Sequence, residues 1–235
     1  MPLSSIAPSI AKSLLLVLPV VFLAVSPGQA SCTDKPKPGV NWSNCTKTKI
    51  IMRDDTFDGA KFQNADLSAS TLSGSSFKKA VFVRANLTRT SFRDADLEGA
   101  DLSKAFGQRT SFKGANLVGS TLSKAEILRA DFTGADLTGA DLSKAELSRA
   151  SLADAKLEGV NLQHANISRA DFTGASLAGT DFLGAYMYLT RLEGVDLSGA
   201  VNLTSQQIEI ACGDDATSLP QGVAKPASWP CGSDE

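Results

Sequence analysis

The chain has 235 residues, with 23 Lys or Arg, 25 Asp or Glu and a formal net charge of −2, so it is close to neutral. Histidine, the commonest acid-base group, occurs once, at His164. No nucleophile motif, phosphate-binding loop or metal-ligand spacing is found. The composition therefore argues against an enzyme and predicts neither a cofactor nor a metal site.

Residues 1–30 are predicted to form a signal peptide. Lys12 precedes an apolar run from Leu14 to Val25, and the small residue Ala30 ends the segment. The run is shorter than the roughly 18 to 20 residues that cross a bilayer. We expect cleavage after Ala30, export to the periplasm or the extracellular space, and no membrane span in the mature chain.

Residues 31–54 precede a regular pattern and are expected to cap its N-terminal end. An open stack of strands exposes backbone groups and apolar side chains at its ends, which would otherwise recruit other chains. Trp42 is predicted to cover the first two aromatic levels, Phe57 and Phe62.

Residues 55–201 follow a five-residue period. Every fifth residue from Phe57 to Leu197 is a centre, and 27 of these 29 centres are Leu, Phe or Ile, with Gly107 and Met187 as exceptions. The residue two positions before each centre is small, most often Ala. Residues five apart do not lie on the same face of a helix, and they do not lie on the same face of a strand. The chain must therefore turn at every pentad. Four pentads then make a square coil of 20 residues, and about seven such coils stack at strand spacing with their centres inward.

Residues 130–142, with the sequence Ala-Asp-Phe-Thr-Gly-Ala-Asp-Leu-Thr-Gly-Ala-Asp-Leu, resemble the pentapeptide repeat family. The resemblance covers residues 55–201 and implies an all-β, right-handed quadrilateral β-helix, in agreement with the square coil. Members of this family differ widely in function, so the fold alone does not identify a role. Some imitate DNA and inhibit topoisomerases with a strongly acidic rod, which is the least favoured alternative for a near-neutral chain.

Residues 202–235 are predicted to form a C-terminal cap. The segment from Thr204 to Gln207 resembles a capping box that opens a short helix through Ala211, and Gly213 ends it. Trp229 lies in the last loop. The residues from 211 to 229 are similar to tails of exported bacterial members of uncharacterised role.

The four cysteines flank the repeats in two pairs. An even number in an exported chain suggests disulfides. Of the three connectivities, we favour Cys32 with Cys45 and Cys212 with Cys231, because the rod should hold the two flanks apart. Lipidation of Cys32 is an alternative.

Basic residues gather in two neighbouring columns when the sequence is arranged in 20-residue coils. These columns form the basic stripe, and His164 continues the second of them. Two interpretations are open: neutralisation by carboxylates two residues away, such as Glu126, Asp131 and Glu146, or a linear anion site. The stripe comprises Arg89, Arg109, Arg129, Arg149 and Arg169 in one column, and Arg84, Lys104, Lys124 and Lys144 in the column before it.

Large apolar side chains also occupy positions that are normally polar, and we name five of them the apolar patch. Phe106 is expected either to fill the space at Gly107 or to stay exposed. Exposed apolar patches mark partner sites, whereas packing on the C-terminal cap is the alternative. The patch comprises Phe106, Leu183, Tyr186, Tyr188 and Leu189.

Together these features predict an exported, non-enzymatic structural or interaction protein that binds a protein partner along one side of the rod, helped by Tyr186, Tyr188 and Leu189. The alternative is a polyanion, either a glycan or lipid headgroups, bound by the basic stripe. Nucleic acid is not expected, because an exported protein rarely meets it and few aromatic rings lie near the stripe. The two caps favour a monomer.

Overall fold

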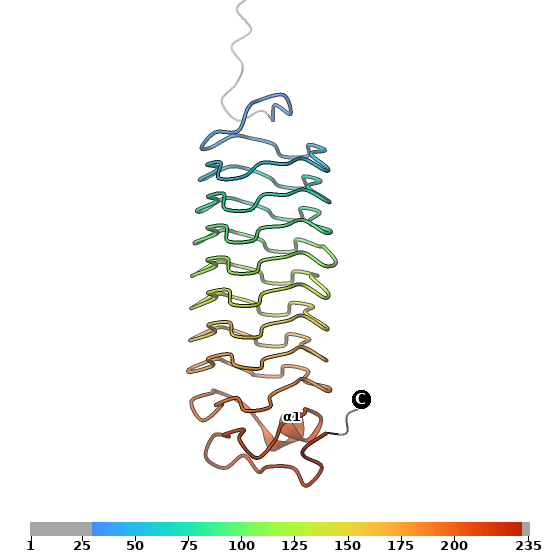
Figure 1. Cartoon of the computed structure of the whole chain (residues 1–235), viewed down its shortest axis with the longest axis vertical. Coiled ribbons are helices and arrows are strands. Elements are labelled where there is room, and N and C mark those ends of the chain that lie inside the picture. Colours follow the sequence, from blue (N-terminus) through green and yellow to red (C-terminus); the bar gives the residue numbers. More distant parts are fainter. Residues whose placement is uncertain (1–29, 232–235) are drawn as a thin grey trace, which may run out of the picture.

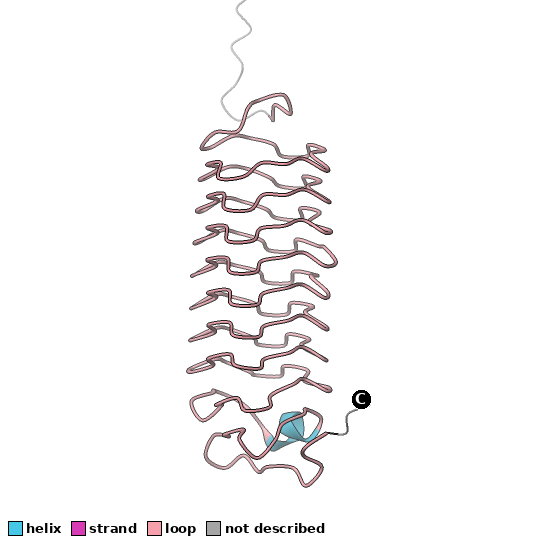
Figure 2. Ribbon diagram, viewed as in Figure 1, coloured by secondary structure: helices cyan, strands magenta, loops and turns pink. Residues whose placement is uncertain are grey.

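The computed structural model describes residues 30–231, which form a slender rod of stacked coils (Figure 1). Parallel bridges join residues 20 apart, beginning with Asn41 and Lys61 and continuing on every side to Asp181 and Val201. The predicted quadrilateral β-helix is therefore confirmed. Each side contributes a single bridge before the chain turns, so the coils are drawn as loop in Figure 2.

The coils begin earlier than predicted. The ladder starts at Asn41, so residues 41–54 belong to the first coil and eight 20-residue coils fill residues 41–200. Trp42 is buried and its ring centroid lies 5.6 Å from that of Phe57 and 5.8 Å from that of Phe62, as expected of a cover. The pattern is concealed because Lys47 occupies an apolar centre, with its Nζ 4.1 Å from the Trp42 ring centroid.

Nearly every pentad closes with a hydrogen-bonded turn, and the pentad of Gly107 has only a bend. The backbone amide three residues after a centre donates to the carbonyl of that centre, as in Ala65 to Phe62 (3.0 Å) and Ala85 to Phe82 (2.8 Å). The residue two after the centre has a positive φ, for example +66° at Gly134 and +55° at Arg129. This left-handed third residue is the mark of a type II turn.

The axis of the rod is filled by the centres. Phe92, Phe112 and Phe132 stack coil upon coil, with successive ring centroids 5.4 and 4.8 Å apart. Most hydroxyls of the small column are paired, as at Thr90, which donates to the carbonyl of Leu67 at 2.8 Å, and the buried hydroxyl of Ser120 is an exception. The interior is thus continuous and close-packed, which is how a chain poor in long strands stays folded.

Gly107 is buried and Phe106 stays exposed, so the bulky ring does not fill the missing centre. Instead the backbone itself takes up the space. A β-carbon on Gly107 would lie 2.8 Å from the carbonyl carbon of Leu87 in the coil before and 2.7 Å from Oγ1 of Thr110. This glycine is required by the close approach of two coils.

Gly107→Leu, which would restore the repeat pattern, is therefore expected to destabilise the rod. Overpacking of this kind lowers the free energy of unfolding by about 1–3 kcal/mol. Denaturant unfolding measures it, and Met187→Leu is the matched control, because that buried centre has room for an isosteric side chain. A gain in stability on Gly107→Leu would contradict the packing described above.

The C-terminal cap begins with α1 (Ser205–Glu209), which is shorter than predicted. The capping box between Thr204 and Gln207 is present. The side-chain amide of Gln207 also donates through Nε2 to the carbonyls of Phe182 (2.7 Å) and Ala185 (3.0 Å), so this side chain ties the helix to the last coil. Over residues 30–231, no helix is long and apolar enough to cross a membrane.

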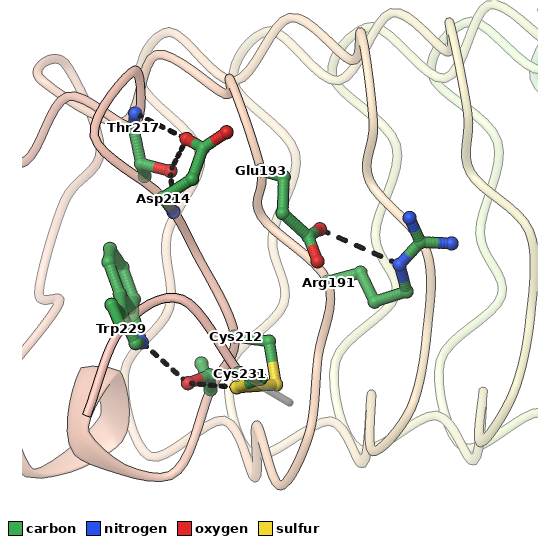
Figure 3. The surroundings of a disulfide bond; sticks show 8 residues. Arg191, Glu193, Cys212, Asp214, Thr217, Trp229 and Cys231 are labelled. Atoms are coloured by element: carbon green, nitrogen blue, oxygen red, sulfur yellow. Dashed lines mark hydrogen bonds and ion pairs between the residues drawn. A yellow bond between two sulfur atoms is a disulfide. The ribbon is translucent and has the colours of Figure 1, made fainter. Parts of the chain in front are cut away.

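Both favoured disulfides are present, Cys32–Cys45 and Cys212–Cys231. The Cys32–Cys45 disulfide uses the thiol of Cys32, which would have to be free for lipidation at that residue. At the second, the indole of Trp229 donates to the carbonyl of Ala211 at 2.7 Å (Figure 3). The predicted signal peptide lies outside the described residues except for Ala30.

Asp214 organises the loop beside this disulfide (Figure 3). Its carboxylate accepts the backbone amides of Gly194 (2.9 Å), Ala216 and Thr217 (3.0 Å each). The Gly194 amide is the main cause of an Asp214 pKa below its usual value. The stabilisation from this carboxylate is thus present above the ordinary Asp pKa and is lost as the pH falls through the lower folded value.

Candidate binding face

One side of the rod, which we name the basic face, carries the basic stripe at both of its edges. It consists of residues 84–89, 104–109, 124–129, 144–149 and 164–169, stacked by the bridges that link Asn86, Phe106, Glu126, Glu146 and Asn166. Neighbouring coils lie about 4.8 Å apart, so like charges recur at that interval along each edge. In water, such a repulsion costs under about 1 kcal/mol per pair before screening by salt.

All nine residues of the basic stripe are exposed and occupy the left-handed third position of the turn. Their φ angles lie between +55° at Arg129 and +60° at Arg149. The equivalent position on the other two edges is mostly glycine, as at Gly134 and Gly139. A side chain with a β-carbon costs about 1 kcal/mol in this conformation, so the stripe is maintained against backbone strain.

Neutralisation by neighbouring carboxylates is not observed. Within residues 30–231, none of the nine stripe side chains takes part in an ion pair. Asp131 instead accepts a hydrogen bond from the backbone amide of Thr133 (3.0 Å), and Glu146 accepts one from the side-chain amide of Asn166 (2.9 Å). The ion pairs of the coils lie on other sides, such as Lys156 with Asp136 at 3.2 Å.

Positive charge is most concentrated in the first two coils of the basic face. Residues 84–89 and 104–109 contain four Lys or Arg and no Asp or Glu, whereas Glu126 and Glu146 lie within the next two coils. The field near an exposed group reflects the charges within about a Debye length of 10 Å, so these two coils attract anions most strongly.

A shallow groove of about 510 Å³ opens at this end of the basic face. It arises because Ala69 occupies the column that carries arginine in the next five coils, so a side chain is missing there. Sequence reasoning missed the groove, although the interruption of the arginine column is its signal. The lining residues are Ser68, Ala69, Thr88, Arg89, Gln108 and Arg109.

The apolar patch lies at the opposite end of the basic face. Tyr186 and Tyr188 are 52% and 41% exposed, and their ring centroids are 6.4 Å apart. The guanidinium of Arg169 lies 5.4 Å from the Tyr188 ring centroid, so the stripe and the patch are continuous. Leu183 is exposed, and half-buried Leu189 lines a crevice against the cap.

Phe106 does not belong to this cluster. It is 45% exposed and shares a column with Tyr186, but four successive bridges separate the two residues. A shared column places residues on one side, not at one level. Conversely, Ile210 of the cap borders the Leu189 crevice, and it was missed because the repeat register ends before it.

In the described part of the chain, no group of three His, Cys, Asp or Glu residues could hold a metal ion. His164 is exposed at the edge of the basic face, as predicted. What the face can do chemically is present cationic and aromatic groups to a partner.

Two family models, both described as pentapeptide repeats, match the chain. One, of eight copies, matches residues 90–127, 130–169 and 165–201, and the other, of nine copies, matches residues 57–104. Together they cover more than half of the chain. No match is found among curated proteins.

Among solved structures, the chain is similar to HetL of the cyanobacterium Nostoc, involved in heterocyst differentiation regulation: 24% identity, 79% of this chain, 87% of that one, TM-score 0.46. It is also similar to QnrB1, a plasmid-mediated fluoroquinolone resistance protein (18%, 77% and 89%, 0.46). A pentapeptide repeat protein of the Arabidopsis thaliana thylakoid lumen is 31% identical over 56% of this chain and 84% of that one, with a TM-score of 0.36.

Proposed function

Because the chain belongs to the pentapeptide repeat family, whose members are generally structural or interaction proteins, we propose that it is a non-enzymatic protein that binds a protein partner along its basic face. The partner presents an acidic surface to the basic stripe and an apolar contact to Tyr186, Tyr188 and Leu189. Charge complementarity of this kind increases association rate and specificity.

The observation that carries this proposal is the unpaired state of the stripe. Nine exposed basic side chains hold strained turn positions, yet none forms an ion pair in residues 30–231. Glycine occupies most equivalent positions in the other two columns, where it avoids the strain. If the basic residues served solubility alone, nothing would require them to replace glycine in these two columns. The contact of Arg169 with Tyr188 supports one continuous face.

Export is part of the proposal. The leader-like segment at residues 1–30 and the two disulfides support it, because structural disulfides persist in oxidising compartments.

Crosslinking and recovery of partners from the exported compartment tests the proposed function. A variant with Arg109, Arg129 and Arg149 changed to Glu is expected to lose at least about tenfold of the recovered partner, because it reverses three charges at the centre of the face. The matched control changes Lys79, Arg93 and Lys113 to Glu, which removes the same charge from other sides of the rod. Unchanged recovery with the first variant, or equal loss with both, would refute the proposal.

A polyanion is the second candidate, favoured by the even spacing of unpaired charges over five coils. The two candidates differ in salt dependence. Polyanion binding should weaken steeply as ionic strength rises, whereas a protein contact that includes the apolar patch should retain most of its affinity. Retention on an immobilised sulfated polysaccharide, measured against salt, separates them.

A further inference from the structure

The groove at the N-terminal end of the basic face contains many hydrogen-bond donors and no carboxylate. Arg89 and Arg109 come from successive coils, and Thr88, Gln108 and Ser68 add hydroxyl and amide groups. None of these five side chains makes a hydrogen bond or an ion pair within residues 30–231, so their donors are open to a ligand.

The surroundings of the groove strengthen its positive field. Arg84 and Lys104 lie in the same two coils, on the opposite edge of the basic face, and no acid lies between them and the groove. Asp66 is the acidic residue nearest in sequence to the residues that line the groove. Its carboxylate accepts a hydrogen bond from the backbone amide of Ser68 at 2.9 Å. An anion entering the groove therefore meets a net excess of positive charge.

We propose that this groove binds a tetrahedral oxyanion, a phosphate or sulfate group, carried by the protein partner of the basic face. Arg89 and Arg109 project from backbones about 4.8 Å apart, so their two guanidinium groups can donate to different oxygens of one anion. A phosphate ester offers three acceptor oxygens, which matches two guanidinium groups and their polar neighbours better than the two oxygens of a carboxylate. The inference rests on the proposed function, because the groove forms one end of that face.

Titration of the purified protein with inorganic phosphate and sulfate, followed by amide chemical shifts at constant ionic strength, tests the proposal. We expect saturable shifts centred on Thr88, Arg89 and Arg109, with acetate binding more weakly. Arg89→Gln with Arg109→Gln should weaken phosphate binding by at least about tenfold, because two charge-assisted donors are lost.

The matched control is Arg129→Gln with Arg149→Gln, two coils further along the same column. All four arginines have positive φ, from +55° to +60°, so the two variants change charge equally and leave the turn strain unchanged. Phosphate affinity should fall much less in this control, because Arg129 and Arg149 contribute to the field near the groove but do not line it. Equal weakening in both variants, equal binding of acetate, or absence of saturable shifts would each overturn the oxyanion site.

The source of the anion is tested with a phosphoserine peptide, its unmodified form and a sulfated disaccharide. Tighter binding of the phosphopeptide than of the other two supports a modified protein partner, whereas tighter binding of the sugar overturns that assignment. These titrations use no captured partner. Phosphate binding without partner recovery would defeat only the proposed function, and partner recovery without phosphate binding would defeat only the oxyanion site.

Discussion

Phe112→Ala is expected to lower the free energy of unfolding by about 3–5 kcal/mol. The ring is fully buried and stacks between Phe92 and Phe132, with centroids 5.4 and 4.8 Å away. The cavity cannot collapse easily, because backbone hydrogen bonds hold the coils on both sides, such as Phe92 N to Ser111 O and Phe112 N to Asp131 O, both 2.7 Å. The loss therefore includes the transfer term and the cavity term.

Denaturant unfolding at constant temperature measures this loss. Phe106→Ala is the matched control, since it removes the same side chain six residues earlier from an exposed position. Its effect should stay within about 0.5 kcal/mol. Similar losses in the two variants would mean that the stacked aromatic column does not carry the stability of the rod.

Hydrogen exchange adds a spatial check on the same variant. In a stacked coil each level contacts only its neighbours, so faster exchange should be confined to amides near Phe112 and should leave the coil of Leu162 protected. Uniform acceleration along the rod would instead indicate one global unfolding unit.

The interior of the rod could be predicted because a five-residue period leaves the chain only one way to bury its centres. Trp42 over Phe57 followed from the need to cover an open end, and both disulfides from the rod that separates the flanks. The five-residue period did not predict the structure correctly where a different interaction took the place of an apolar centre. Lys47 over the Trp42 ring concealed the first coil, and the backbone at Gly107 filled a space that the pattern assigned to a side chain.

For the candidate site, the sequence predicted only which basic residues share a column of the rod. The 20-residue register placed the arginines together, but it gave no information on whether Asp131 or Glu146 would neutralise them, since each carboxylate has several donors within reach. The groove beside Ala69 depends on which side chains leave space, and the crevice at Ile210 on how the cap returns to the last coil. Both are properties of packing between coils and not of the repeat.

Replacing Arg89, Arg109, Arg129 and Arg149 together by glycine is expected to stabilise the rod while abolishing partner binding. Each residue has a φ between +55° and +60°, where glycine avoids the strain of a β-carbon but adds freedom to the unfolded chain. The net gain is up to about 1 kcal/mol per site, or up to about 4 kcal/mol for four sites, and removal of stacked like charges adds a salt-dependent part.

The corresponding Arg→Gln variant separates the two causes, because it removes the charges and keeps the strain. It should gain only the salt-dependent part of the stability and should lose the partner as fully as the glycine variant. Denaturant midpoints and partner recovery are measured on both. If the glycine variant unfolds at lower denaturant than the parent, the guanidinium groups contribute to the fold; if it is more stable and no longer binds, the strained arginines are maintained for recognition, in the usual opposition between stability and function.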